Sequence, residues 1–321
     1  MIKVEALVKT FGATKAVDGI SFEVAEGETL ALLGTSGCGK TTTLKMLNRL
    51  IEPDSGSIAI NGKNVMDEKP ETLRRGIGYV LQNNGLFPHY TVAENIAIVP
   101  QLLGWDKTKT DKRINELLGK LHLDKKYLSA YPNELSGGQQ QRIGLARALV
   151  ADPPLLLMDE PFGALDNVTR AKIHGEFKAL DELKRKTIIL VTHDVQEAFE
   201  LADRIALMDK GKIVQIGTPA ELLFHPKNKL VRDFLNEQRL QLEFRAIKVT
   251  DLWKYLPDGG RKTNTSSLSA EADFWAVLEQ FKFEKGEHIS IQHPSEEKVK
   301  TITFEQLMAA YSHYKQLQAH E

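Results

Sequence analysis

Eight consecutive residues, Gly34–Thr41, carry the clearest chemical pattern in this chain of 321 residues. Their sequence is Gly-Thr-Ser-Gly-Cys-Gly-Lys-Thr, which matches the phosphate-binding motif G-x-x-x-x-G-K-[ST]. Glycines let the backbone fold closely around an anion with its N–H groups pointing inward. Lys40 can reach the β- and γ-phosphates, and the Thr41 hydroxyl can coordinate Mg²⁺. The motif predicts a phosphate and metal site with contacts from Gly34, Ser36, Gly37, Cys38, Gly39, Lys40, Thr41 and Thr42.

Two adjacent carboxylates are the second group that could do chemistry. Asp159 and Glu160 follow the apolar run Leu155–Met158, which predicts a strand that ends in both acids. Strand-end carboxylates beside a phosphate loop suit a metal ion and a water molecule. We expect Asp159 to bind Mg²⁺ and Glu160 to act as a general base or to polarise the water.

The elements on either side of the phosphate loop support the motif. Residues 28–33 follow a turn at Glu26-Gly27 and end in four apolar residues, and they predict a buried strand. Thr42–Leu50 predicts a helix whose positive N-terminus faces the phosphates. From average residue usage, a chance match in a chain of this length has a frequency of roughly one per cent. The strand and the helix lower that frequency further and predict an α/β fold of the P-loop NTPase type.

Composition limits the class of protein. The length suits one large and one small domain. The 42 basic and 43 acidic residues leave a net charge of -1, so no basic field favours nucleic acid. No apolar run approaches the about 18 residues that span a bilayer, and no signal peptide is evident. We therefore expect a soluble, cytosolic protein. The single cysteine, Cys38, excludes an internal disulfide; it is either an alkylation-sensitive thiol or a small residue tolerated in the loop.

A second motif separates this chain from other P-loop proteins. Leu135–Gln139, Leu-Ser-Gly-Gly-Gln, starts an alanine- and leucine-rich helix that runs to about Val150. The order of phosphate loop, this motif and the carboxylate strand resembles the ATPase subunit of ABC transporters, whose signature is LSGGQ. The resemblance implies ATP and Mg²⁺ as cofactors and ATP hydrolysis coupled to transmembrane solute transport. It also implies a RecA-like core with an antiparallel β subdomain and a helical subdomain.

The resemblance assigns roles to five further residues. It implies that Phe11 stacks on adenine and that Val17 packs on the base and ribose. Gln82, at the end of an apolar strand, would contact Mg²⁺ and the attacking water. His193, at the end of the next β-rich run, would contact the γ-phosphate, and Asp166 would make a dimer contact. Without the resemblance, Phe11 would be ordinary core and His193 a structural histidine.

The signature motif also implies a second subunit. Ser136 and the N–H groups of Gly137, Gly138 and Gln139 would form another anion site at a helix N-terminus. In ABC ATPases this site holds the γ-phosphate that the other subunit binds. The chain has one phosphate loop and one signature, so we expect a head-to-tail homodimer with ATP between the subunits.

Several segments look like one branch of the family, the importers of glycine betaine, carnitine, choline and other quaternary-ammonium osmoprotectants. This likeness implies integral membrane permease subunits, an indirect link to a solute-binding protein, and a place on the inner face of the cell membrane. In the family, the region of residues 85–89 at the start of the helical subdomain (about 84–148) receives a coupling helix from the membrane partner. The segments are Ser36–Met46, Gly85–His89, Ala93–Pro100, Leu102–Trp105 and Asp159–Asp166.

The chain after the ATPase region has a different character. We expect the ATPase domain at 1–236, a linker at 237–245 and a small α/β domain at 246–321. Ser269 is the predicted N-cap of a helix that contains Phe274, and 288–292 predicts a strand. Thr303–Gln306 is a capping-box pattern for the last helix. This strand–helix–strand–helix order resembles one degenerate CBS unit, a regulatory module; nucleotide sensing, dimer contact and a vestigial role all remain open.

Three other functions compete with an osmoprotectant importer. ATPases that import polyamines, iron or sugars typically end in small β-barrels, which the helical periodicity of 269–318 disfavours. Soluble ABC proteins that act on ribosomes or DNA usually carry two ATPase domains or long insertions, and neither is evident here. A nucleotide-gated module without turnover would not need Glu160 and His193.

Overall fold

The computed structural model describes residues 1–82, 85–163, 165–258, 268–283, 288–294 and 298–318. The chain forms two compact units, Met1–Ile216 and Gly217–Glu321. Helices α8 (Pro219–Phe224) and α9 (Lys229–Asn236) therefore group with the second unit, whereas the sequence analysis placed them in the first domain. The stretch expected as a linker is mostly helix α10 (Arg239–Ala246).

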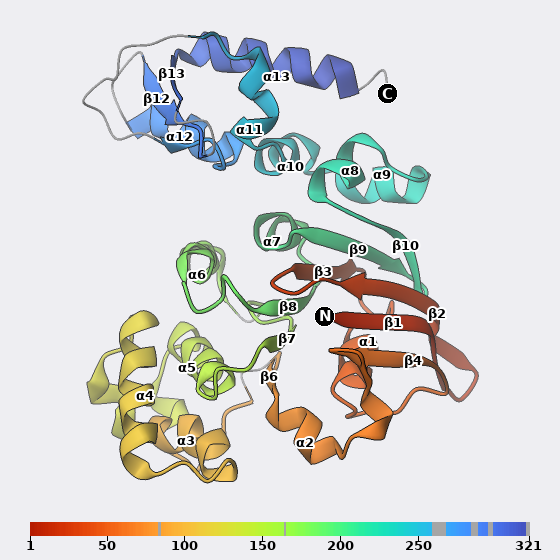
Figure 1. The fold of residues 1–321 in the computed structure, drawn as a ribbon, viewed down its shortest axis with the longest axis vertical. Coiled ribbons are helices and arrows are strands. Elements are labelled where there is room, and N and C mark those ends of the chain that lie inside the picture. The colour runs from red at the N-terminus through yellow and green to blue at the C-terminus, as the bar shows by residue number, and fades with distance from the viewer. Residues whose placement is uncertain (83–84, 164, 259–267, 284–287, 295–297, 319–321) are drawn as a thin grey trace. The chain divides into compact units, whose positions relative to one another are not determined.

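A six-stranded sheet forms the centre of the first unit (Figure 1). Its strand order is β10-β9-β3-β8-β7-β6, and β3 pairs in parallel with β8 and β9, as β7 does with β8 and β6. Near-continuous apolar runs form the inner strands because helices or a second sheet cover both faces. The strands are β3 (Thr29–Gly34), β6 (Ile77–Val80), β7 (Leu155–Asp159), β8 (Thr187–Thr192), β9 (Arg204–Asp209) and β10 (Lys212–Gly217).

Alternate residues of the central strands enter two different cores. Leu156 and Met158 pack with the helical region, while Leu155 and Leu157 pack with the first helix and the N-terminal strands. Successive side chains of a strand point to opposite faces, so one apolar run fills both cores. The ends of the central strands are thereby held rigidly between two packed layers.

An antiparallel sheet of order β2-β1-β4-β5 covers one side of this unit, as expected for the β subdomain. Its strands are β1 (Ile2–Phe11), β2 (Thr14–Val24), β4 (Ser55–Ile60) and β5 (Lys63–Asn64). Asn61 and Gly62 both have positive φ, 52° and 76°, in the turn between β4 and β5. This is the conformation that an Asn-Gly hairpin turn favours. The neighbouring helical elements are α1 (Lys40–Leu47), η1 (Val65–Asp67) and α2 (Pro70–Arg75).

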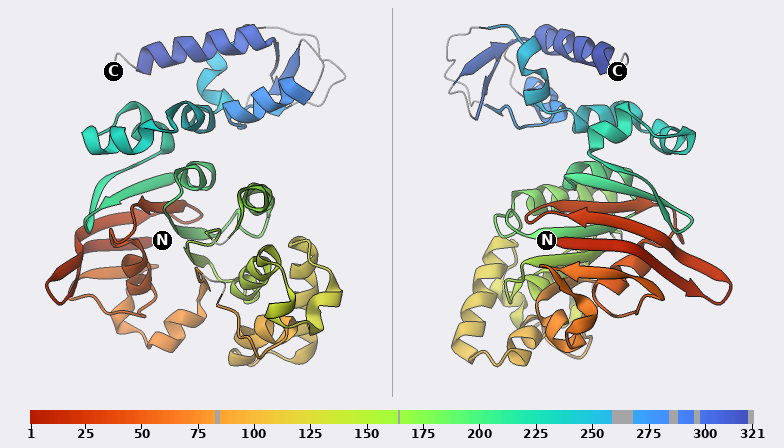
Figure 2. Two further views of the ribbon diagram at one scale, coloured as in Figure 1. Left: turned by 180° about the vertical axis from the view of Figure 1, so that it is seen from behind. Right: turned by 45° about the vertical axis from the view of Figure 1, so that its right-hand side comes forward.

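A group of helices lies apart from the antiparallel sheet, as the yellow ribbons show in both views of Figure 2. One apolar face of α4 and the residue after it is buried, with Ile114, Leu117, Leu118 and Leu121 in the core. No helix of the described residues is long and apolar enough to cross a membrane. The elements of this group are α3 (Val92–Leu102), α4 (Lys107–Lys120), η2 (Lys125–Ser129), η3 (Pro132–Glu134) and α5 (Gly137–Leu149). Two further helices follow in the chain, α6 (Asn167–Ala179) and α7 (Val195–Leu201), and α7 packs against β3 and β8.

The second unit has its own core, in which Phe274, Ile291 and Leu307 are fully buried. In its sheet of order β11-β12-β13, β12 pairs in parallel with β11 and antiparallel with β13. The fully buried Glu243 carboxylate accepts hydrogen bonds from Tyr311 (2.7 Å), Lys315 (2.7 Å) and Arg239 (2.8 Å). The remaining elements are α11 (Val249–Leu252), η4 (Trp253–Tyr255), β11 (Leu268–Ser269), α12 (Phe274–Phe283), β12 (Ile289–Gln292), β13 (Val299–Ile302) and α13 (Phe304–Gln318).

The capping predictions for this unit had mixed outcomes. Thr303 and Gln306 form the predicted capping box at the start of α13. The prediction for Ser269 was wrong, because Asp273 Oδ1 accepts the Ala276 N–H (2.8 Å) at the start of α12. Ser269 Oγ instead accepts the Glu271 N–H in the preceding turn. Among the described residues from β11 onward, the order is strand, helix, strand, strand, helix, which has one strand more than expected.

Candidate nucleotide site

The phosphate loop connects β3 to α1, as the motif predicted. Gly34 has φ 153°, and a Cβ there would lie 2.3 Å from Met208 O. Gly39 has φ 107°, and its Cβ would lie 2.3 Å from Ala16 O. Only glycine permits these close backbone approaches, so both positions fix the path of the loop.

Lys40 lies inside this loop and is 4% exposed. Its Nζ donates to Gly34 O at 2.8 Å and to Thr35 O at 3.0 Å. Ser36 and Gly37 are exposed at the outer side of the loop, while Thr42 is half-buried. The ammonium of Lys40 is therefore held against two carbonyl groups of the loop.

Two oxygen donors meet beside the loop. The Thr41 hydroxyl donates to Asp159 Oδ1 at 2.8 Å, and Asp159 is 4% exposed at the end of β7. Burial raises the pKa of this carboxyl group, and a bound cation would counter that effect. Within the described ranges, no cluster of three or more His, Cys, Asp or Glu residues could hold a metal. Thr41 and Asp159 fit Mg²⁺, which takes few protein oxygens and shares phosphate oxygens.

Two of the predicted catalytic residues contact one carboxylate oxygen of the third. Glu160 Oε2 accepts a hydrogen bond from Gln82 Nε2 at 2.9 Å and lies 3.2 Å from His193 Nδ1. The three residues follow strands β6, β7 and β8, which are parallel neighbours, so their carboxyl ends meet at one edge of the sheet. Glu160 has φ 44°, and its N–H donates to Val191 O at 2.9 Å. This strained conformation at a polar cluster is typical of a functional site.

The signature motif forms a helix N-terminus. Ser136 is the N-cap of α5: its Oγ accepts the Gln139 N–H at 3.4 Å, and Gln139 Oε1 accepts the Ser136 N–H at 2.8 Å. Ser136 and Gly137 are exposed, and Gly138 is buried. Asp166 is also exposed, and its Oδ1 accepts the Thr169 N–H at 3.0 Å. The predicted second anion site is thus on the surface, available to another molecule.

The two residues predicted to hold the base differ in exposure. The Phe11 side chain at the end of β1 is 50% exposed, with Lys9 Nζ 5.6 Å from its ring centroid. Val17 is fully buried in the core beside Gly39. The Phe11 ring is accessible to a base, and stacking stays a prediction. The Val17 side chain is not accessible to a base or ribose in this structure.

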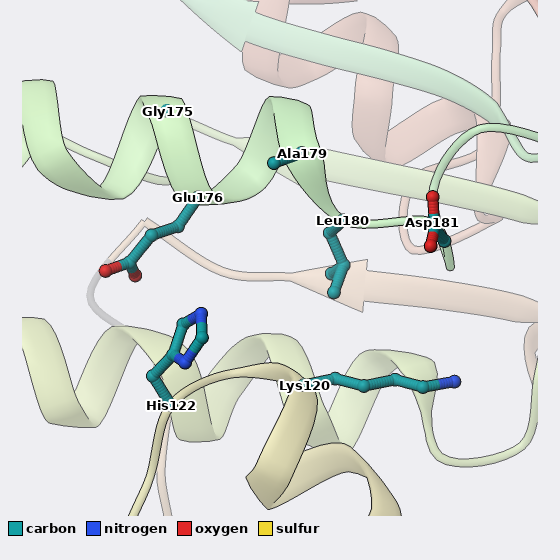
Figure 3. Close-up of a pocket in the computed structure, with 7 residues that line it drawn as sticks. All are labelled: Lys120, His122, Gly175, Glu176, Ala179, Leu180 and Asp181. Carbon is teal, nitrogen blue, oxygen red and sulfur yellow. The ribbon is translucent and has the colours of Figure 1, made fainter.

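A separate pocket of about 390 Å³ lies between α6 and the segment after α4 (Figure 3). Figure 3 shows Lys120 and His122 on one side and Glu176 on the other. Lys120 pairs with Glu116 and Glu182, and Glu176 pairs with Arg142. Because these charges are compensated within the protein, the pocket is a poor phosphate site, and the phosphate loop remains the candidate site.

Sequence reasoning missed four residues whose side chains hold the segment around His193 by hydrogen bonds and an ion pair. Arg170 contacts Asp194, and Thr192 contacts the buried Glu197. No motif marks these residues, because each partner lies on a different element. Only their hydrogen bonds in the folded chain reveal them.

The fold and the site define the class of protein. A parallel sheet carries a phosphate loop, and an antiparallel sheet and a helical region with an exposed LSGGQ terminus flank it. This is the cassette fold of the ABC ATPases within the P-loop NTPases.

Comparisons with known proteins agree with this class. Residues 17–163 match the family described as ABC transporter. The chain is 54% identical over 241 residues to the glycine betaine/carnitine/choline transport ATP-binding protein OpuCA of Bacillus subtilis (strain 168), covering 75% of this chain and 63% of the relative. It is 51% identical over 263 residues to the osmoprotectant import ATP-binding protein OsmV of Salmonella typhimurium, covering 80% and 69%. The chain thus spans less than two thirds of the length of some of these relatives.

Solved structures show the same cassette. The ATP-binding cassette MJ0796, a dimer in a post-hydrolysis state bound to ADP and Pi, has a TM-score of 0.61 and 33% identity, over 68% of this chain and 98% of that chain. The cbiO1 protein of Clostridium perfringens, part of the ABC transporter complex cbiONQ, has a TM-score of 0.64 and 27% identity, over 75% and 95%. The chain belongs to the ATP-binding proteins of the ABC transporter family.

Proposed function

We propose that this protein hydrolyses ATP and thereby powers an importer of glycine betaine, choline or carnitine-type osmoprotectants. The observation that carries the ATPase proposal is the convergence of Gln82 and His193 on Glu160, beside the Thr41–Asp159 pair. A carboxylate held by two polar groups at the edge of a phosphate loop is suited to orient and polarise a water molecule.

Each predicted site residue has one role in the proposed reaction. Lys40 binds the β- and γ-phosphates, and the loop amides surround them. Thr41 and Asp159 would hold Mg²⁺, which would neutralise phosphate charge. Glu160 accepts a proton from the attacking water, while Gln82 and His193 orient the carboxylate and the γ-phosphate. Phosphoryl transfer needs this positioning more than covalent chemistry.

The exposed signature terminus supports a shared site in a homodimer. Ser136 would close over the ATP that the partner binds with its own Lys40. The dimeric state of the solved relative MJ0796 supports this arrangement. One subunit would then supply the base and the metal ligands, and the other the anion clamp.

Mixed dimers test the shared site. Ser136→Arg chains alone and Lys40→Ala chains alone should fail to form ATP-stabilised dimers in light scattering. An equal mixture should form them, since each mixed dimer keeps one complete site. Hydrolysis gives the second readout: the Ser136→Arg and Lys40→Ala mixture should recover turnover, whereas a mixture of Lys40→Ala and Glu160→Gln chains should recover none, because both of these residues serve the same subunit's site. Normal ATP-dependent dimerisation of Ser136→Arg alone would contradict the arrangement.

The solute is proposed from the relatives alone. Relatives at 51–54% identity are named for glycine betaine, carnitine, choline or osmoprotectant transport, whereas a sulfate/thiosulfate import protein of Pectobacterium atrosepticum is 44% identical. Uptake of labelled glycine betaine, choline and sulfate should be measured in cells that lack this protein and in cells that regain it. Restoration of sulfate uptake alone would contradict the osmoprotectant proposal.

A surface of the helical region is proposed to receive the membrane partner. Phe87 and Tyr90 are 50% and 46% exposed, with ring centroids 5.5 Å apart. The buried Asn95 side chain donates to the carbonyls of Phe87 and Tyr90 and accepts the Phe87 N–H, so this aromatic pair is held outward. Phe87→Ala should reduce co-purification of the membrane subunits, while Met66→Ala, at a similarly exposed apolar side chain, should not.

A further inference from the structure

One arginine connects the two segments that carry Glu160 and His193. Arg170, in the first turn of α6, donates through its Nη2 to Leu165 O at 2.8 Å and through Nε to Phe162 O at 3.3 Å. Its Nη1 lies 3.4 Å from Asp194 Oδ2. Phe162 and Leu165 follow Glu160 in the chain, and Asp194 follows His193.

The His193 segment is fixed on its other side as well. Asp194 Oδ1 accepts the N–H groups of Gln196 (2.9 Å) and Glu197 (3.2 Å) as the N-cap of α7. Thr192 Oγ1 accepts the Asp194 N–H at 2.9 Å and donates to Glu197 Oε2 at 2.5 Å. The carboxyl group of Glu197 is buried, at 3% exposure. The backbone on both sides of His193 is therefore held by hydrogen bonds to the side chains of Thr192 and Asp194.

The imidazole itself has less support. The His193 side chain is 56% exposed, and its Nδ1 lies 3.2 Å from Glu160 Oε2. With so much of the ring in solvent, its direction depends mainly on the backbone that carries it. A change of the segment at Asp194 would therefore alter the separation of His193 from Glu160.

We propose that Arg170 is a positioning residue for the hydrolysis proposed above: by tying the Phe162 and Leu165 carbonyls to Asp194, it sets the separation of Glu160 and His193. The inference rests on the proposed function. A guanidinium suits this task because its rigid planar fork can serve three acceptors at once, whereas a lysine ammonium is a point charge on a flexible stem. The phosphate loop is on β3 and α1, so ATP binding itself does not depend on this connection.

The alternative is that Arg170 merely stabilises the start of α6. Two measurements separate these roles. A positioning role lowers kcat at nearly unchanged KM for ATP, because small displacements of reacting groups cost up to about a hundredfold in rate. A positioning role also depends on the group that is positioned, here the His193 side chain. In a chain that already carries His193→Ala, Arg170→Ala should therefore lower kcat little further. A purely structural role would add the same loss in both backgrounds and lower the melting temperature in proportion.

The experiment uses the full chain with MgATP. Arg170→Ala and Arg170→Lys should each lower kcat by about tenfold or more, with KM within about twofold. Asp194→Asn keeps an N-cap for α7 but removes the ion pair. It should lower kcat in the same way and cause no further loss when combined with Arg170→Ala. The matched control is Arg74→Ala, because Arg74 also donates to two carbonyls, of Asn48 and Arg49, at another place in the same unit.

The outcomes are distinct. A kcat unchanged in the Arg170 variants, or an equal loss with and without His193, would overturn the inference. If Arg170→Ala does not fold, Arg170→Lys and Asp194→Asn decide the question by the same two measurements. A wild-type chain without MgATP turnover would contradict the proposed function instead, so the two failures are distinguishable.

Discussion

Gln82 Nε2 donates a 2.9 Å hydrogen bond to Glu160 Oε2, although 78 residues separate the two along the chain. The parallel pairing of β6 with β7 brings them together, since both residues follow the carboxyl ends of adjacent strands. Gln82 is also the last described residue before the helical region. The contact therefore joins the candidate base to the chain segment from which that region begins.

Cys38 should resist alkylation in the folded protein. Its side chain is 3% exposed, and burial raises the pKa of the thiol, so little reactive thiolate is available. We expect maleimide to react at least about tenfold more slowly with the native chain than with the chain in urea. Equal rates under both conditions would favour the alkylation-sensitive thiol that the sequence left open.

Glu197 should make stability depend on pH. Burial raises the pKa of this carboxyl group from 4.5 to about 8, and the Asp194 and Glu160 charges add to the rise, while Thr192 and Arg170 oppose it. Between these two values the folded chain keeps a proton that the unfolded chain releases. The free energy of unfolding therefore falls as pH rises through this window, by up to about 1.4 kcal/mol per pH unit.

Glu197→Gln tests this dependence, because the amide stays neutral at every pH and its carbonyl can still accept from Thr192. Urea unfolding at pH 5, 6, 7 and 8 should show the variant gaining stability relative to wild type as pH rises. At pH 5 the two chains should be most alike in charge, which makes that measurement the internal control. A stability difference that stays constant from pH 5 to pH 8 would refute the assignment of a neutral Glu197.

Removal of the second unit should preserve the nucleotide site. Every predicted site residue lies within the unit Met1–Ile216. A chain of residues 1–217 should therefore bind MgATP with affinity close to that of the full chain, measured by calorimetry. A chain that ends at Asn236 should be less stable than the chain of residues 1–217. It keeps α8 and α9 but lacks helix α10, which packs against α8.

The same truncation tests a regulatory role for the second unit. With the membrane partner present, the response of transport to salt should differ between the full and the truncated chain if the unit is a control module. Identical salt curves would leave it without that role, and loss of ATP binding by residues 1–217 would show that the first unit does not stand alone.

Local motifs predicted the parts of the site that depend on contiguous residues. The phosphate loop is fixed by glycines at Gly34 and Gly39, whose backbone requirements are visible in the sequence itself. The carboxylate strand was predictable because an apolar run ends in two acids. Ser136 was predictable as an N-cap because its motif begins a helix.

Other features depend on pairs that only folding brings together. Arg170 and Asp194 are 24 residues apart, and neither stands in a pattern that marks a contact. Ser269 and Asp273 are both residue types that cap helices well. Asp273 is the N-cap of α12, because Ser269 belongs to strand β11. The burial of Val17 follows from the packing of β2 near Gly39, which local sequence does not specify.

The central claim is that Glu160 activates the attacking water, and steady-state MgATP turnover by Glu160→Gln tests it most directly. The amide cannot accept a proton, so turnover should fall at least about a hundredfold, the scale of a lost general base. The variant should still bind MgATP and form an ATP-stabilised dimer on a sizing column. Glu26→Gln, a change of the same chemistry at an exposed turn, should keep normal turnover. Near-normal hydrolysis by Glu160→Gln would contradict the account.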